Sequence, residues 1–254
     1  MEEADLHPHR TVYWLNPKIE DPEKHAAEVA RLCDVYRAAR ELQAAGTHVV
    51  SCDEKTGIQA LERAAPTRPM RPGLLERREF EYLRHGTLCL MANLEVATGQ
   101  VIAPSVGPTR SEADFLRHVL QTVATDPTAG WIFVVDNLNT HCSDSLVRYV
   151  AGLEGFAGDL GHKGKQGILQ NTESRSAFLA DPTHRVRFVY TPKHCSWLNQ
   201  VEIWFSILVR RALKRASFAS LEQMATAILD FIAYFNRLLA KPFRWTYTGR
   251  PLHA

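Results

Sequence analysis

The sequence has no feature that would place it in a membrane or mark it for export. Its 254 residues contain no uninterrupted apolar segment that approaches the roughly 18–20 residues needed to span a bilayer. The first five residues, Met-Glu-Glu-Ala-Asp, are acidic, whereas a secretory signal begins with basic and then apolar residues. We therefore expect no membrane partner.

Cysteine is scarce and irregularly placed. The five cysteines are odd in number and include no Cys-x-x-Cys pair, which favours a reducing cytosol over a disulfide framework. Two His-Cys pairs, at residues 141–142 and 194–195, could supply ligands for zinc. Adjacent His and Cys residues lack the usual ligand spacing, so zinc is the weaker interpretation of these pairs.

A phosphate-cradling loop is missing too. Gly161, Gly164 and Gly167 are spaced three apart in the irregular region 152–182, but no Gly-Lys-Ser/Thr follows them and no strand precedes them. The chain also contains no internal repeat and no low-complexity tract. We expect no small-molecule substrate.

What is present is an ordinary globular composition with uneven charge. Hydrophobic residues make up 45% and charged residues 23% of a chain that suits one large domain. The formal net charge is +2, but residues 185–254 carry a net +8 and residues 1–184 a net −6. The basic part indicates a polyanionic partner, although a solvated helix face would explain the same clustering.

Periodicity and capping residues predict the order of the elements. The predicted elements are a helix over 22–43 with Asp21 as N-cap, a strand ending at 53, a hairpin over 88–96 and 100–103, a helix over 111–123, a strand over 131–136, a helix over 143–152, a strand over 185–190, and helices over 198–215 and 220–239. The Arg- and Pro-rich residues 62–86 are expected to form an extended excursion. This order is that of an α/β ribonuclease-H-like fold, a mixed five-stranded sheet flanked by helices, with an insertion at about 152–182 before the last strand.

Three acidic residues occupy positions typical of a phosphoryl-transfer site. Asp53 and Asp136 end short apolar runs that are expected to be buried strands, and open α/β sheets place their sites at the carboxyl ends of strands. Glu202 interrupts an apolar helical stretch, where a lone buried carboxylate would be costly. Three converging carboxylates would repel one another unless divalent cations shared them. Two such ions, about 4 Å apart, suit in-line displacement at a phosphodiester.

Each acid also has a purely structural interpretation. Asp53 and Asp136 could be ordinary turn formers at strand ends. Glu202 could belong to a polar stripe at a helix edge, which Asn199, Ser206 and Arg210 would share at three- and four-residue spacings.

The segments around these acids resemble the signature blocks of DDE transposases. The blocks are 50–57 (Val-Ser-Cys-Asp-Glu-Lys-Thr-Gly), 134–137 (Val-Val-Asp-Asn) with His141, and 191–204, which contains Ser-Trp-Leu-Asn-Gln-Val-Glu. The runs 84–87 and 240–247 look similar as well. The resemblance is to bacterial insertion-sequence transposases of the mariner-like superfamily and covers roughly residues 45–250.

The resemblance implies a function and a set of residues. Asp53, Asp136 and Glu202 would be the catalytic triad, binding two Mg²⁺ or Mn²⁺ ions for hydrolysis at transposon ends and strand transfer into target DNA. The partner would be double-stranded DNA, with a homodimer when two ends are synapsed, in the bacterial cytoplasm and associated with the nucleoid. Candidate DNA-binding residues are Arg84, His85, His141, Lys193, His194, Trp197, Asn199, Arg210, Arg211, Lys214, Arg215, Lys241 and Arg244.

Among these candidates, His141 could instead orient a metal ligand or be purely structural. Trp197 and Trp245 are the aromatic residues expected to stack on bases.

The sequence also departs from the family pattern. Asp136 and Glu202 are sixty-six residues apart, which is longer than the family's commonest spacing, and the excess falls in region 152–182. Loop closure becomes costly only slowly with length, so such an insertion is tolerable. Residues 1–45 are expected to be a linker and helix that would follow a helix-turn-helix region, with the catalytic domain over 46–254. A remnant that binds DNA or a full-length transposase, and a structure-selective nuclease, remain alternatives.

Overall fold

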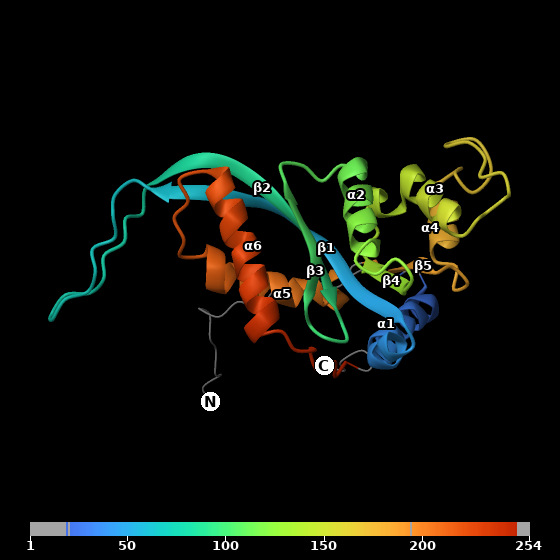
Figure 1. Ribbon diagram of the computed structural model, residues 1–254, viewed down its shortest axis with the longest axis horizontal. Coiled ribbons are helices and arrows are strands. Elements are labelled where there is room, and N and C mark those ends of the chain that lie inside the picture. Colours follow the sequence, from blue (N-terminus) through green and yellow to red (C-terminus); the bar gives the residue numbers. More distant parts are fainter. Residues whose placement is uncertain (1–18, 20, 194, 248–254) are drawn as a thin grey trace, which may run out of the picture.

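The computed structural model describes residues 19, 21–193 and 195–247. A five-stranded sheet in the order β3-β2-β1-β4-β5 forms its centre, with helices on both faces (Figure 1). The elements are α1 (Pro22–Ala44), β1 (Thr47–Arg63), β2 (Tyr82–Glu95), β3 (Val101–Gly107), α2 (Glu112–Val123), β4 (Gly130–Val135), α3 (Asp144–Leu153), α4 (Thr172–Leu179), β5 (Val186–Tyr190), α5 (Val201–Leu208) and α6 (Leu221–Leu238). The predicted mixed α/β sheet is confirmed.

The sheet combines antiparallel and parallel pairing. β1 is antiparallel to β2, and β2 to β3, whereas β1, β4 and β5 run parallel. The parallel contact of β1 covers only residues 47–51, opposite 130–134 of β4. Beyond that point β1 pairs with β2 alone, and the two strands form a ribbon that projects from the sheet (Figure 1).

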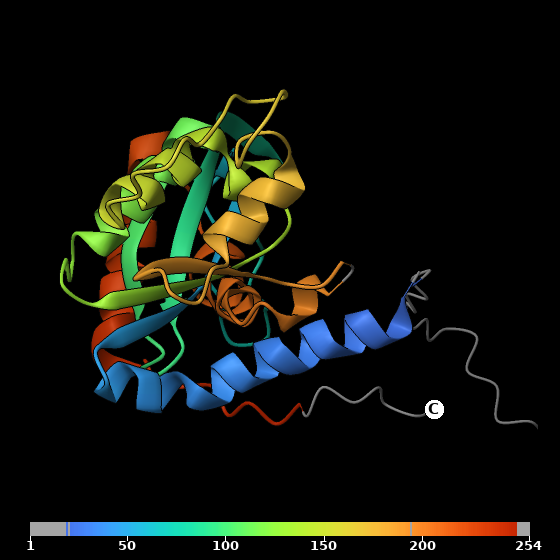
Figure 2. The ribbon, with the colours of Figure 1, turned by 90° about the vertical axis from the view of Figure 1, so that its right-hand side faces the viewer.

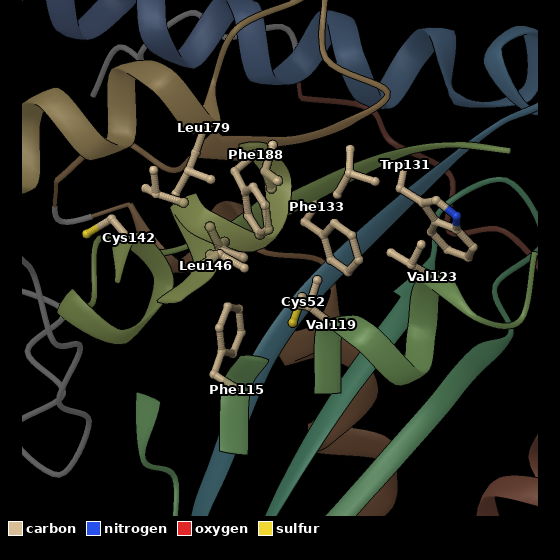
Figure 3. Packing of buried hydrophobic residues seen from close by; sticks show 14 of the residues in the cluster. Cys52, Phe115, Val119, Val123, Trp131, Phe133, Cys142, Leu146, Leu179 and Phe188 are labelled. Carbon is tan, nitrogen blue, oxygen red and sulfur yellow. The ribbon is translucent and has the colours of Figure 1, made fainter. Parts of the chain in front are cut away.

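The apolar runs of the central strands are explained by burial on both faces. Along β4, Trp131, Phe133 and Val135 pack under α2, α3 and α4 (Figure 3), whereas Ile132 and Val134 pack against α1. Successive side chains of a strand point to opposite faces, so covering both faces requires a continuous apolar run. Figure 2 shows α1 running along its face of the sheet.

A separate apolar cluster joins the ribbon to the C-terminal helices. Leu90 and Leu94 of β2 pack with Trp204 of α5 and with Met224 and Ile228 of α6. This contact places α5, and with it Glu202, beside β1.

β1 is longer than the sequence predicted. The strand was expected to end at Asp53 but continues to Arg63, and β2 begins at Tyr82, before the predicted hairpin at 88. Residues 54–57 are polar and show no apolar alternation, so the sequence carries no signal that the strand continues. The excursion is therefore confined to residues 64–81, where isolated bridges join Arg68 to Arg77 and Arg71 to Leu74.

The helices at 22–43, 111–123, 143–152 and 220–239 are confirmed, and the side chains of Asp21, Ser111, Ser143 and Ser220 cap them. The predicted helix 198–215 is shorter: a 3₁₀ turn (Ser196–Leu198) precedes α5, and its continuation (Val209–Leu213) is π-helical. Region 152–182 contains α4 and is more regular than expected. In the part of the chain that the structure describes, no helix has the length and apolarity that a membrane span requires.

Candidate active site

Asp53 and Asp136 lie at the same edge of the sheet, on neighbouring parallel strands. Ser51 of β1 pairs with Val134 of β4, so each aspartate lies two residues beyond this pair. Asp136 directly follows the last residue of β4, as predicted. Asp53 lies within β1, just past the residues of β1 that pair with β4. It therefore occupies the predicted carboxyl edge of the parallel strands, although β1 itself continues beyond it.

Asp53 is buried and held by two hydrogen bonds. Its Oδ1 accepts from the backbone N–H of Glu54 at 2.7 Å, and its Oδ2 accepts from Asn199 Nδ2 at 3.2 Å. The pKa of Asp53 is raised to about 7, chiefly by burial and also by the charges of Asp136, Glu202 and Glu54, while the hydrogen bond from the Glu54 N–H acts to lower it.

Asn199 ties the segment before α5 to β1. Its Nδ2 donates to the carbonyl of Cys52 at 2.9 Å, and its Oδ1 accepts from the hydroxyl of Ser51. The same hydroxyl accepts from the backbone N–H of Val201 at 2.9 Å. Asn199 is completely buried, which argues against the predicted DNA contact. Its hydrogen bonds instead fix Asp53 and the first turn of α5.

Glu202 lies in that first turn and is exposed. The expectation that its carboxylate is buried in an apolar helix is wrong. Helix α5 buries Val201, Trp204, Phe205 and Leu208, which form one face, and Glu202 lies outside this face. The charge of Glu202 still reaches Asp53, whose pKa it raises. Asp53 and Asp136 thus share one edge of the sheet, and Glu202 lies on α5, near enough for its charge to act on Asp53.

His141 lies between two carboxylates. Its Nδ1 is 2.7 Å from Asp136 Oδ1 and its Nε2 is 3.0 Å from Glu54 Oε1. Burial would lower the pKa of His141, but the hydrogen bonds to Asp136 and Glu54 outweigh burial and raise it to about 9. Burial would likewise raise the pKa of Asp136, but the hydrogen bond from His141 lowers it below its usual value. The side chain of His141 is completely buried, which argues against the predicted contact with DNA.

Sequence reasoning missed Glu54, although a signal for it was present. Side chains alternate along β1, so Asp53 points to the face that carries α5, and Glu54 points to the face that carries α2. Cys52, which shares the α2 face, packs in the cluster of Phe115 and Cys142 (Figure 3). Two adjacent acidic residues within one strand therefore place one carboxylate on each face.

The donor set fits hard divalent cations. Carboxylate oxygens are the ligands that Mg²⁺ and Mn²⁺ prefer, and a cation would relieve the repulsion that Asp136 and Glu202 add to the effect of burial on the pKa of Asp53. Across residues 19, 21–193 and 195–247, no three His, Cys, Asp or Glu side chains are yet grouped closely enough to hold one ion. Binding would therefore require these side chains to close up. The same finding leaves the zinc interpretation without a ligand group in this part of the chain, and His194 lies outside it.

The basic candidates divide into exposed and buried residues. Arg84, Lys193, Arg210, Arg211, Lys214, Arg215, Lys241 and Arg244 are exposed. His85 is half-buried and contacts Glu62 at 2.7 Å. Trp197 is 55% exposed although its ring packs edge-on against Tyr247. Trp245 is less exposed and packs edge-on against Tyr36, which argues against base stacking.

Residues 48–225 match the model of a family described as DDE superfamily endonuclease. The chain belongs to this family. No curated protein matches this chain.

Solved structures of low identity share the fold. The Mos1 mariner paired-end complex with Mn is 13% identical with a TM-score of 0.51, covering 89% of this chain and 59% of that one. The Mos1 transposase paired-end complex with the left transposon end is 14% identical with a TM-score of 0.52, covering 88% and 58%. The Mos1 strand transfer complex is 13% identical with a TM-score of 0.51, covering 88% and 58%. The DDE endonuclease thus has the ribonuclease-H-like fold and spans less than two thirds of the Mos1 chains it matches.

Proposed function

We propose that this chain is the catalytic domain of a cut-and-paste DNA transposase, with Asp53, Asp136 and Glu202 as ligands of two Mg²⁺ or Mn²⁺ ions. The observation that carries the proposal is the placement of Asp53 and Asp136 side by side at one sheet edge, with Glu202 near enough for its charge, like that of Asp136, to raise the pKa of Asp53. Membership of the DDE endonuclease family supports it. When bound, the ions would supply activation of the nucleophile and stabilisation of the leaving oxygen.

The protein's part is to hold the carboxylates and the scissile phosphate in place. A cavity of about 460 Å³ next to Asp136 is lined by residues 136–139 and 191–193 together with Ser196. Lys193 contributes the positive charge of this cavity and is positioned to hold a phosphate beside Asp136. The loop that carries Asp136 is braced by Asn137, whose Nδ2 donates to the carbonyl of Thr191 at 2.5 Å.

A second basic surface would bind the DNA outside the cavity that lies next to Asp136. Arg210, Arg211, Lys214 and Arg215 line a cavity of about 570 Å³ around the π-helical continuation of α5. Such residues neutralise phosphates without reading sequence. Because α5 also carries Glu202, one continuous helical segment would both contact the DNA and contribute an acid to the triad.

The remaining parts of the proposal concern the assembly and its setting. Double-stranded DNA would be both the transposon end and the target, and two copies of the protein would meet when two ends are synapsed. The protein would act in the bacterial cytoplasm, associated with the nucleoid. This chain spans less than two thirds of the Mos1 chains that it matches. We therefore assign the recognition of transposon ends to none of the residues that the structure describes.

The test compares DNA substrates. Supercoiled plasmid, linear duplex and branched DNA are incubated with the chain in Mn²⁺, first alone and then fused to an upstream helix-turn-helix module. A transposase domain is expected to nick supercoiled DNA and to join the freed 3′-hydroxyl to a second duplex, with both activities abolished by chelation. Cleavage confined to branched DNA would indicate a structure-selective nuclease instead. DNA binding without cleavage by either protein would reject the proposal in favour of a non-catalytic remnant.

A further inference from the structure

A continuous hydrogen-bonded chain runs from the interior of the protein to the proposed metal ligand Asp136. Glu54 Oε1 lies 3.0 Å from His141 Nε2, and His141 Nδ1 lies 2.7 Å from Asp136 Oδ1. A carboxylate only accepts hydrogen bonds, so both nitrogens of His141 donate. The side chains of Glu54 and His141 are 1% and 0% exposed, whereas that of Asp136 is 30% exposed. Only Asp136 can therefore meet a ligand from solution.

Folding alone does not explain this arrangement. Glu54 Oε2 is buried and has no hydrogen-bond partner among the described residues, and such an orphaned oxygen costs free energy. The backbone around His141 is nevertheless firmly held, since its carbonyl accepts from the hydroxyl of Tyr190 at 3.0 Å. The carbonyl of Cys142 accepts from the buried guanidinium of Arg175 on α4. Costly buried polar groups that are held this rigidly point to a functional reason.

The contacts also distinguish the two oxygens of Asp136. Oδ1 accepts from His141 and from the backbone N–H of Leu138 at 3.0 Å. No hydrogen bond to Oδ2 is found among the described residues, so Oδ2 is available to a cation. Ligating carboxylates are commonly oriented in this way by hydrogen bonds from a second layer of residues.

We propose that Glu54 and His141 are positioning residues, which fix Asp136 through its Oδ1 so that Oδ2 is presented to the divalent ion. Glu54 acts only through His141, whose ring it orients from the opposite side. This inference rests on the proposed function, because it assumes that Asp136 is a metal ligand. It assigns a task to the acidic neighbour of Asp53 and links α4, through Arg175, to the loop that carries His141.

The test measures Mn²⁺ binding directly, by titration calorimetry without DNA, in the full chain. Glu54→Gln keeps shape and acceptor but removes the charge, and His141→Asn removes the bridge. Both variants are expected to weaken Mn²⁺ binding roughly 10- to 100-fold, the usual effect of removing such a partner. Raising the Mn²⁺ concentration should restore their DNA cleavage. The double variant should lose little more than His141→Asn alone, because the two residues act as one unit.

A matched pair elsewhere in the sheet supplies the control. Glu95 is buried and lies 2.5 Å from His48 Nδ1, near the N-terminal end of β1. Glu95→Gln therefore also removes a buried Glu–His contact, but it should leave the Mn²⁺ affinity unchanged. Thermal unfolding without metal identifies any variant that fails to fold, in which case the other variant decides.

The outcomes separate this inference from the proposed function. Wild-type affinity in folded Glu54→Gln and His141→Asn would overturn the positioning role while the proposed function stands. Equal weakening by Glu95→Gln would also overturn it, since the effect would then be a general loss of stability. If the wild-type chain neither binds Mn²⁺ nor cleaves DNA, the proposed function fails, and this inference fails with it.

Discussion

Asn199 is the residue on which the position of Asp53 depends most directly. One amide group donates to a β1 carbonyl and to the Asp53 carboxylate, and accepts from the Ser51 hydroxyl. All of these groups are buried, so removing the amide would leave several polar atoms without partners. Such atoms are more costly than the lost hydrogen bonds themselves.

We expect Asn199→Ala to lower the free energy of unfolding by about 1–3 kcal/mol, because Ser51 and the carbonyl of Cys52 lose their buried partner. The exposed Asn139 offers a control, since Asn139→Ala should change stability by no more than about 0.5 kcal/mol. Urea unfolding of both variants measures the difference. Equal stability of the two variants would show that the Asn199 amide does not hold β1 to the α5 segment.

Residue types alone predicted the three acids but not their surroundings. The Asp53 and Asp136 positions follow from the ends of apolar runs, and these were read from the sequence. The exposure of Glu202 could not be predicted, because the apolar Ile203 beside it is itself 43% exposed and made the helix look apolar all round. The contact of Glu54 with His141 joins residues 87 apart in sequence, and no local pattern specifies such a distance.

At the scale of elements, helices were easier to predict than strand lengths. The N-cap and first-turn acids of α2 specify where it begins, and both are local signals. The end of β1 depends on its pairing with β2, which continues through register shifts between Lys55 and Ile58 and between Gln59 and Leu61. Pairing of this kind is a tertiary property, so the polar residues 54–57 gave no sign that the strand continues.

The turn between β2 and β3 makes a close contact with the segment after α6. Gly99 has φ +74°, and a Cβ built there would lie 2.1 Å from the carbonyl oxygen of Lys241. Gly46, which follows α1, has φ +83° but open space around the same position. A side chain at either position would therefore strain the backbone, but only at Gly99 would it also collide with another segment of the chain.

We expect Gly46→Ala to cost about 1–2 kcal/mol of stability from the left-handed backbone alone. Gly99→Ala should cost roughly 1–3 kcal/mol more, because the backbone of Lys241 must move. Thermal or urea unfolding of the two variants gives the comparison. Similar losses in both would mean that the chain after α6 is not packed against this turn.

At the scale of the whole molecule, charge is separated along the chain and in space. The basic residues around the end of α5 face solvent, and the acids Asp53 and Asp136 lie at the edge of the sheet. Non-specific DNA binding through the basic residues would release counterions and weaken as salt rises.

The logarithm of the DNA-binding constant should therefore fall steeply with the logarithm of the salt concentration. The double variant Arg210→Gln/Arg211→Gln should reduce this slope by about 2, because each lost phosphate contact contributes about 0.9. Arg148→Gln on α3 is the matched control, because Arg148 is exposed but already paired with Asp144 at 2.8 Å. Fluorescence anisotropy with duplexes of unrelated sequence measures the slopes. A flat salt response, or equal slopes for both variants, would contradict phosphate binding at this surface.

Cleavage by Asp136→Asn tests the central claim most directly, because this change keeps shape and volume but removes the charge that would hold a divalent ion. In Mn²⁺, nicking of supercoiled DNA should fall roughly 100-fold or more, which corresponds to about 2.7 kcal/mol of lost transition-state stabilisation, while folding and DNA binding survive. Asp230→Asn, at an exposed position on α6, should nick like the wild type. Undiminished nicking by Asp136→Asn, or nicking that persists after divalent ions are chelated, would contradict the account.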